Sequence, residues 1–423
     1  MSTPNGIGGT TASGIAASVR DLVGMGRVRG GDALPPIRSL AHELGVNRNT
    51  VAAAYRLLVA AGVAETRGRG GTVIAGVPDV ARDGMRVSRE LVDLASGNPD
   101  PRLLPDVVEY VDGYVASLYG APVEHDDLVA WAREHLGRES VAVTHGAVDA
   151  IERLLAVHLT RGDAVAVEDP CFLAHISTLR LNGFAAEPVA VDRAGMSPDG
   201  LERALRAGAR AVICTPRAQN PTGASLTRER AAALREVLAR HPQVLVIEDD
   251  HFWALSGAAY HRVTPAEMPR WALVRSVAKF LGPDLRLAIV AADEDTTDRL
   301  HARLGPATTW VSHLLQHAVA GMLADPRIEQ LRQTARGAYA ERAALLVNAL
   351  RIAPAITPDG LNVWIETAAT ADALAARGWR VRPAADFAVG RTIDAVRVTT
   401  STLTAEQAEA FATDLEDAAC SRA

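Results

Sequence analysis

The chain has 423 residues, of which 48% are hydrophobic and 22% are charged, and its formal net charge is −6. This length exceeds what a single core usually serves, so we expect two or three domains, and the composition excludes a disordered or fibrous chain. The three cysteines are scattered without disulfide or metal-ligand spacing, the apolar runs are too short to span a bilayer, and no secretion signal is recognisable, so we expect a cytoplasmic protein without a metal.

The charge is unevenly distributed along the chain. Residues 1–75 carry eight arginines against four acidic residues, which gives +4, and the remainder therefore carries −10. A basic N-terminal segment on an acidic body predicts an anionic partner for that segment.

Three helices are predicted in the basic segment. Apolar residues at helical spacing indicate a first helix over 15–23 and a second over 37–44, and Pro35 and Pro36 lead into the second, since proline is favoured at the start of a helix. Gly45 is expected to end the second helix. Asn47 is expected to cap a third, whose inward-facing residues are Val51, Tyr55 and Leu58.

Two short strands, expected at 63–67 and 72–74, flank a glycine-rich turn and complete the pattern of a winged helix-turn-helix with an all-α core and a β-wing. In such a domain the third helix enters the major groove with its N-terminus first, and the wing approaches the phosphate backbone or the minor groove. A three-helix domain that docks onto another protein is the alternative.

The stretch from Leu34 to Val73 contains LPPIRSLAHELGVNRNTVAAAYRLL and AETRGRGGTVI, and it resembles the GntR-type winged helix. Family members usually have serine where this chain has Asn47, and both residues can cap a helix. The helix positions and the resemblance together predict the DNA-binding residues Arg38, Asn47, Arg48, Asn49, Thr50, Arg56, Arg67, Arg69 and Gly70.

After a predicted linker at 76–91, apolar runs alternate with helical patterns. Strands are expected at Ala164–Val167, Ala209–Cys214, Val244–Ile247, Ala272–Arg275 and Leu287–Val290. This alternation predicts an α/β body with a mostly parallel sheet and helices on both faces. Ligands bind such sheets at the carboxyl ends of the strands, where the polar motifs of this chain begin.

The body contains the one lysine of the chain, Lys279, against 43 arginines. A desolvated lysine amine can lose its proton and attack a carbonyl to form a Schiff base, whereas a guanidinium cannot. Drift toward arginine in a GC-rich genome is the other explanation for the count.

Three of the predicted strands are followed by groups that an aldehyde cofactor with a pyridine ring and a phosphate would use. In this hypothesis Lys279 forms the Schiff base, Asp249 pairs with the protonated ring nitrogen, and Asn220 bonds the ring hydroxyl. Ser276 and Arg286 would hold the phosphate. They would be assisted by backbone N–H groups at the start of a helix, those of Gly146, Ala147 and Val148.

Over residues 92–423 these motifs, in this order, resemble fold-type-I pyridoxal 5'-phosphate (PLP) enzymes of the class I aminotransferase group. The resemblance implies a large domain to about residue 300 and a smaller C-terminal α+β domain at about 301–423. It also implies that Phe172 stacks on the ring, that Arg397 binds a substrate or effector carboxylate, and that Tyr119 reaches the neighbouring subunit's phosphate. A core role for Phe172, and the chance occurrence of an arginine at 397, are the alternatives.

The chain departs from the aminotransferase pattern at His251, which stands where those enzymes have a tyrosine that bonds the ring oxygen. An imidazole can donate the same bond, but imidazoles titrate near neutral pH. A surface histidine without a role is the alternative. We therefore expect cofactor binding with, at most, part of the PLP chemistry.

A GntR-type head joined to an aminotransferase-like body is identified as the architecture of the MocR family of bacterial regulators. IEDDHFWALSG, RSVAKFLGPDLRLAIVAAD, WVSHLL and GLNVW resemble its PtsJ-like branch, repressors tied to vitamin B6 salvage. The resemblance implies a head-to-tail homodimer that binds double-stranded operator DNA and senses PLP, alone or with an amino acid or a B6 vitamer. The alternatives are a working aminotransferase with an accessory DNA-binding domain and a repressor whose body no longer binds cofactor.

Overall fold

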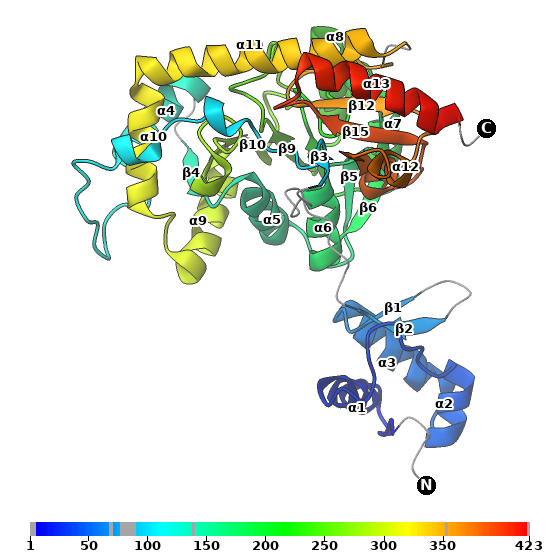
Figure 1. The fold of residues 1–423 in the computed structure, drawn as a ribbon. Coiled ribbons are helices and arrows are strands. Elements are labelled where there is room, and N and C mark those ends of the chain that lie inside the picture. Colours follow the sequence, from blue (N-terminus) through cyan, green and yellow to red (C-terminus); the bar gives the residue numbers. More distant parts are fainter. Residues whose placement is uncertain (1–5, 67–70, 77–89, 138–139, 352–353, 421–423) are drawn as a thin grey trace. The chain divides into compact units, whose positions relative to one another are not determined.

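The computed structural model describes residues 6–66, 71–76, 90–137, 140–351 and 354–420 (Figure 1). The chain divides into two compact units, Met1–Val80 and Ala81–Ala423. Almost all of the linker predicted at 76–91 lies outside the described residues.

The N-terminal unit is a winged helix. It consists of α1 (Ala12–Gly24), α2 (Ile37–Leu44) and α3 (Arg48–Ala60), followed by the antiparallel pair β1 (Ala64–Thr66) and β2 (Thr72–Ile74). Gly45 ends α2 in the left-handed conformation at φ 65°, and the Asn47 side chain accepts the Asn49 N–H at 2.8 Å to cap α3, as predicted. The bounds of α2 are those predicted, since the helix begins at Ile37 and Pro36 precedes it as the N-cap residue.

The three helices of this unit share one core, which contains the buried residues Ile15, Val19, Leu40, Val51 and Leu58. Tyr55 lies at its edge, where its hydroxyl donates to the Pro35 carbonyl at 2.6 Å. Burial, with a contribution from Glu43, raises the pKa of Tyr55 above its usual range, so the hydroxyl stays protonated. One face of α3 therefore packs in the core, and the opposite face is exposed to solvent.

The body is built on an eight-stranded sheet in the order β4-β11-β10-β9-β8-β5-β6-β7. Within it β11 and β7 run antiparallel to their neighbours, and the other six strands share one direction. The five predicted strands are confirmed, with ends shifted by at most two residues. The strands are β4 (Val141–Thr144), β5 (Ala164–Asp169), β6 (Ala185–Asp192), β7 (Gly195–Met196), β8 (Ala211–Cys214), β9 (Leu245–Asp249), β10 (Trp271–Ser276) and β11 (Ala288–Ala292).

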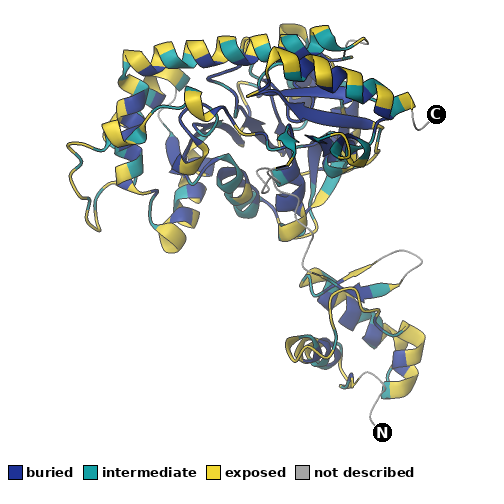
Figure 2. Ribbon diagram, viewed as in Figure 1, coloured by how far each residue is buried: buried dark blue, intermediate teal, exposed yellow. Residues whose placement is uncertain are grey.

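Helices cover both faces of this sheet, and its strands are largely buried apart from β6, in which only Val189 is buried (Figures 1 and 2). Along β5 the side chains of Val165 and Val167 pack with one set of helices, and that of Ala166 packs with the other, as alternation along a strand requires. The first set is α5 (Ala147–His158), α6 (Leu173–Asn182) and α9 (Glu294–Thr308), and the second is α7 (Pro198–Arg206) and α8 (Arg228–Ala239).

The C-terminal part of the body has its own small sheet, in the order β12-β15-β14, and its own core. The 24-residue helix α11 (Pro326–Ala349) connects it to the rest, because Tyr339 packs in the core of the large part and Leu346 in that of the small part. The remaining elements are α4 (Asp126–Leu136), α10 (His313–Ala324), β12 (Asn362–Glu366), α12 (Ala371–Ala375), β14 (Arg382–Pro383), β15 (Ala395–Thr399) and α13 (Ala405–Cys420), with the short parallel pair β3 (Val92–Asp93) and β13 (Trp379–Arg380). Among the described residues, no helix is long and apolar enough to cross a membrane.

Candidate functional site

The predicted polar motifs follow neighbouring strands of the large sheet. Asp249 ends β9, Ser276 ends β10, and Asn220 lies in the loop after β8. Because these three strands are adjacent and parallel, their carboxyl ends meet at one edge of the sheet. All three side chains are buried, so polar groups gather in a part of the molecule from which water is largely excluded.

Lys279 lies in the turn that follows β10. Its Nζ donates a hydrogen bond of 2.7 Å to the carbonyl of Gly97, which belongs to the first described segment of the body. The Oγ of Ser276 accepts the Ala278 N–H at 3.2 Å and so shapes the turn that presents the lysine. The sole amine side chain of the chain is therefore half-buried and oriented by the backbone around it.

Asp249 is 2% exposed, and two imidazoles lie beside one of its oxygens. His175 Nε2 is 3.1 Å and His251 Nδ1 is 3.4 Å from Oδ2, whereas Oδ1 has no hydrogen-bond partner among the described residues. Burial alone would raise the pKa of this carboxyl, but His251 and His175 together hold it well below its usual range. A buried carboxylate oxygen without a partner calls for a hydrogen-bond donor, and a protonated pyridine nitrogen is a donor that also matches the negative charge. The residues present thus fit PLP.

The start of α5, where the sequence predicted phosphate binding, has no side-chain cap. Gly146, at φ 92°, precedes the helix without a side-chain cap, so the first helical N–H groups, including those of Ala147 and Val148, are available to an anion. The Arg286 guanidinium lies alongside, because Nη2 donates to the His145 carbonyl at 3.3 Å and would come within 3.1 Å of a Cβ added at Gly146. Any side chain at 146 would therefore crowd the guanidinium.

Arg397 joins the small sheet to this site. It is fully buried on β15, and its Nη1 donates to Asn220 Oδ1 at 3.0 Å while Nη2 donates to the Ala95 carbonyl at 2.5 Å. The guanidinium carbon also lies 5.1 Å from the centre of the Phe387 ring. The bond to Asn220 occupies the amide oxygen and leaves the NH2 group as the donor available to a ring hydroxyl.

Phe172 and His251 face one another near Asp249. Phe172 directly precedes α6, and its ring is nearly parallel to that of His251, at 17° with the ring centres 6.3 Å apart. His251 was predicted to bond the ring oxygen of the cofactor. In the structure its Nδ1 lies beside the carboxylate that would hold the ring nitrogen, and the bond to the ring oxygen stays a prediction for the other ring nitrogen, Nε2.

Two residues of this site were missed by the sequence reasoning. His175 is 2% exposed in α6 and touches Asp249, and its signal was its position three residues after Phe172, one helical turn along. Glu168, on β5, is fully buried and accepts the Thr215 N–H at 2.9 Å. Burial raises its pKa to about 7, although the Thr215 bonds and His175 act in the opposite direction.

Tyr119 is not buried with the other predicted residues. It is 90% exposed in the loop before α4, where its ring lies 5.6 Å from that of Trp310. It is therefore accessible to a second molecule.

The predicted DNA-binding residues of α2 and α3 lie largely on the solvent side of the winged helix. Arg38, Arg48, Asn49 and Arg56 are exposed, Thr50 is half-buried, and the side-chain oxygen of Asn47 is engaged in the cap of α3. Arg67, Arg69 and Gly70 lie outside the described residues.

Comparison with known proteins matches each unit to a family. Residues 89–415 match the family model "Aminotransferase class I and II", and residues 11–74 match "Bacterial regulatory proteins, gntR family". The vitamin B6 salvage pathway transcriptional repressor PtsJ of Salmonella typhimurium is 48% identical, over 97% of this chain and 99% of its own length. The probable rhizopine catabolism regulatory protein MocR of Rhizobium meliloti is 26% identical, over 76% of this chain and 73% of its own. Among solved structures, the α-aminoadipate aminotransferase LysN of Thermus thermophilus, complexed with N-(5'-phosphopyridoxyl)-L-leucine, has a TM-score of 0.69 at 25% identity, and the match covers 78% of this chain and 93% of that one.

Proposed function

Because the chain belongs to the MocR family, in which a GntR-type winged helix is joined to a class I and II aminotransferase domain, we propose that it is a transcription regulator that binds operator DNA and senses PLP. The main support for the proposal is the buried Oδ1 of Asp249, which has no hydrogen-bond partner among the described residues. The same chain presents an exposed recognition helix, α3. The similarity to PtsJ supports a repressor of vitamin B6 salvage, acting in the cytoplasm where its operator lies.

In this proposal each residue of the site has a defined task toward the cofactor. Lys279 Nζ is the covalent anchor, and Asp249 keeps the proton on the ring nitrogen. Asn220 donates to the ring hydroxyl, and Arg286, with the start of α5, holds the phosphate. When bound, PLP supplies an electrophilic carbonyl and an electron-withdrawing ring.

Sensing requires that the cofactor-bound body favour one arrangement of the DNA-binding units. The coupling free energy between two such sites is typically about 1–3 kcal/mol, which changes DNA affinity by about 5- to 150-fold. The same coupling must change cofactor affinity when DNA binds, so the two effects can be measured independently of one another.

The covalent step is tested by the visible absorption spectrum of the protein with PLP, followed by borohydride reduction and peptide mass spectrometry. We expect the reduced adduct on Lys279 and its loss in both Lys279→Ala and Lys279→Arg. The arginine variant is the matched control, since it keeps the positive charge but cannot form the imine. An adduct elsewhere, or the same absorption band in either variant, would contradict this assignment.

DNA binding is tested at the start of α3. Arg48→Ala should weaken operator binding, and if Arg48 contacts a phosphate the slope of log K against log salt should fall by about 0.9. Arg20→Ala removes the same charge from the exposed face of α1 and should leave operator affinity nearly unchanged. Equal losses in the two variants would mean that only net charge matters and that α3 is not the recognition helix.

We further propose that the protein acts as a head-to-tail homodimer whose contacts include the loop before α4. Figure 1 shows this loop, in cyan, extending from the body. Val115, Leu118 and Tyr119 in it are 82%, 77% and 90% exposed. Exposed apolar side chains clustered in one segment are typical of an interaction surface.

The base of this loop is held by α10, since His313 Nε2 lies 2.9 Å from the Pro122 carbonyl and Gln316 Nε2 donates to the Val123 carbonyl at 2.9 Å. A fixed base lets the exposed tip reach a second copy with less loss of conformational freedom. Leu118→Asp should therefore shift the mass measured by light scattering from dimer to monomer. Leu181→Asp, at an exposed leucine of α6, is the control, and a dimeric Leu118→Asp variant would exclude this interface.

A working aminotransferase is the second candidate, favoured by the place of the buried Arg397 beside Asn220, because the aminotransferase resemblance implies that this arginine binds a substrate carboxylate. Steady conversion of an amino acid and a keto acid by the purified protein would support it. A single half-reaction without turnover would favour the regulator.

A further inference from the structure

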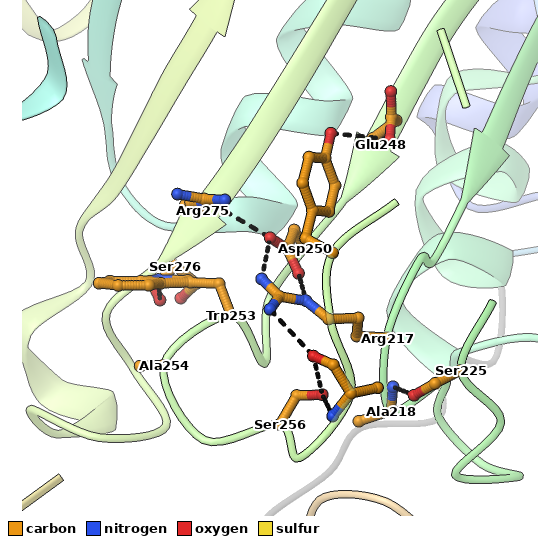
Figure 3. Close-up of polar contacts among 12 residues, drawn as sticks. Arg217, Ala218, Ser225, Glu248, Asp250, Trp253, Ala254, Ser256, Arg275 and Ser276 are labelled. Atoms are coloured by element: carbon orange, nitrogen blue, oxygen red, sulfur yellow. Dashed lines mark hydrogen bonds and ion pairs between the residues drawn. The ribbon is translucent and has the colours of Figure 1, made fainter. Parts of the chain in front are cut away.

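A second carboxylate, next to Asp249, lies at the centre of a buried ionic cluster. Asp250 is 0% exposed and accepts two hydrogen bonds from Arg217, from Nε at 2.9 Å and from Nη2 at 2.6 Å (Figure 3). Arg275 Nε donates to Asp250 Oδ2 at 3.1 Å. Neighbouring side chains on extended backbone point to opposite sides, so this group, the Asp250 cluster, lies behind the carboxylate that would hold the cofactor ring.

Each of the three cofactor motifs contributes one member of the Asp250 cluster. Arg217 stands three residues before Asn220 in the loop after β8. Asp250 stands between Asp249 and His251 at the end of β9. Arg275 directly precedes Ser276 on β10, four residues before Lys279. A single carboxylate thus connects the three segments that carry the amide, the acid and the amine.

Further contacts extend this connection to the loop between β9 and β10. The guanidinium carbon of Arg275 lies 5.5 Å from the ring centres of both Tyr260 and Trp253, and the Arg217 carbon lies 5.4 Å from that of Tyr260. Trp253 Nε1 donates to the Ser276 carbonyl at 2.9 Å. The backbone that leads into Lys279 is therefore supported by the same group of side chains.

A buried cluster of this kind is expected to fix the positions of its side chains more than it increases the stability of the fold. Taking an aspartate and two arginines out of water costs free energy that their mutual attraction only partly returns, so an apolar replacement is often as stable. A two-pronged Arg–carboxylate bond, however, fixes both the distance and the orientation of its partners. Cofactor sites need this, because their groups must be held within about 0.5 Å of the productive geometry.

We propose that the Asp250 cluster is a positioning element, which sets the relative places of Asn220, Asp249 and Lys279 and thereby the affinity of the site for a phosphorylated pyridine aldehyde. The proposal rests on the cofactor-binding function above. It assigns Arg217, Asp250 and Arg275 a role through other residues, since none of them would touch the cofactor.

The test is Asp250→Asn, which keeps the shape of the side chain and removes its charge. We expect the dissociation constant for PLP, from absorbance titration, to rise about tenfold or more, as is common when a supporting residue behind a binding group is changed. The absorption band of the bound form should also shift, while the far-ultraviolet circular dichroism stays as in the wild type.

The matched control is Asp192→Asn at the end of β6. Asp192 also holds an arginine by two bonds, Arg230 Nη1 to Oδ1 at 3.0 Å and Nη2 to Oδ2 at 2.8 Å, but neither residue adjoins a cofactor motif. Cofactor affinity should be unchanged in this variant. Equal weakening in both variants would mean that general destabilisation is responsible and would overturn the proposal.

A double-mutant cycle separates a connected cluster from independent effects. If Arg217 acts through Asp250, the double variant Arg217→Gln with Asp250→Asn should bind PLP within about twofold of Asp250→Asn alone. If the two residues act independently, their separate losses of affinity should multiply.

Should Asp250→Asn not fold, Arg275→Gln provides the same test, because it leaves the Arg217–Asp250 bonds in place and removes the hydrogen bond that connects Asp250 to the lysine segment. Wild-type protein that takes up no PLP refutes the cofactor function and this proposal together. Normal uptake by wild type and folded variants alike refutes the positioning role only.

Discussion

Replacing Glu168 with glutamine should change how the stability of the body depends on pH. Burial raises the pKa of this carboxyl from 4.5 to about 7 in the folded chain. A raised carboxyl pKa gives stability that is fully present below pH 4.5 and is lost as pH rises through about 7, because the unfolded chain gains more by ionising. Between pH 5 and pH 8 this one group should lower the free energy of unfolding by about 2.5 kcal/mol.

The glutamine variant still offers an oxygen to the Thr215 N–H but has no proton to lose. Its melting temperature relative to wild type should therefore rise by about 3 °C from pH 5 to pH 8, given the size of the body. Tryptophan fluorescence reports this unfolding selectively, because all six tryptophans lie between residues 131 and 379.

Groups common to both proteins cancel in the difference between the melting temperatures, so the comparison isolates Glu168. Glu366→Gln, at an exposed position at the end of β12, is the control. If the melting temperatures of Glu168→Gln and wild type differ by the same amount at pH 5 and at pH 8, Glu168 is ionised in the folded state at both pH values. Burial would then not raise its pKa as inferred.

Three further outcomes are expected. Asn47→Ala removes the side-chain bond to the Asn49 N–H and should destabilise α3 by about 1 kcal/mol; amide exchange at the start of α3 should accelerate, and unchanged protection would argue against the cap. The bond to Glu124 raises the pKa of His301, so the stability it confers is present below the unfolded pKa and lost as pH rises through the folded value. The protection factors of amides next to Glu124, from which the intrinsic pH dependence of exchange is removed, should therefore fall from pH 6 to pH 8 in wild type but not in His301→Gln, and an equal fall in both would exclude this pair. Asp249→Asn should weaken PLP binding and shift its absorption band, because a neutral amide cannot hold the ring proton, and an unaltered spectrum would remove Asp249 from that role.

Local features of this fold followed from the sequence because they depend on neighbouring residues. Gly45 ends α2 because glycine tolerates positive φ, and Asn47 caps α3 because its short side chain reaches the backbone two residues on. The buried strands were recognisable as short apolar runs between helical patterns, and their ends moved by at most two residues. Motif order along the chain was enough to place the polar groups at the carboxyl ends of those strands.

Contacts between segments that are distant in the chain depend on the order of strands in the sheet. The hydrophobic periodicity of the sequence does not specify that order. Asn220 and Arg397 are 177 residues apart, and they meet only because the small sheet closes onto the loop after β8. His175 contacts Asp249 for a similar reason, and its position one helical turn after Phe172 could not by itself show that contact.

The sequence by itself therefore determined the two families, the three helices of the N-terminal unit and the position of the polar motifs at the ends of the strands. Only the tertiary structure decided which oxygen of Asp249 has no partner, that burial raises the pKa of Glu168 to about 7, and that Arg217, Asp250 and Arg275 form one cluster. The physical reason is that side-chain pattern is a local property, whereas desolvation and charge pairing depend on everything packed within a few ångströms, whatever its distance along the chain.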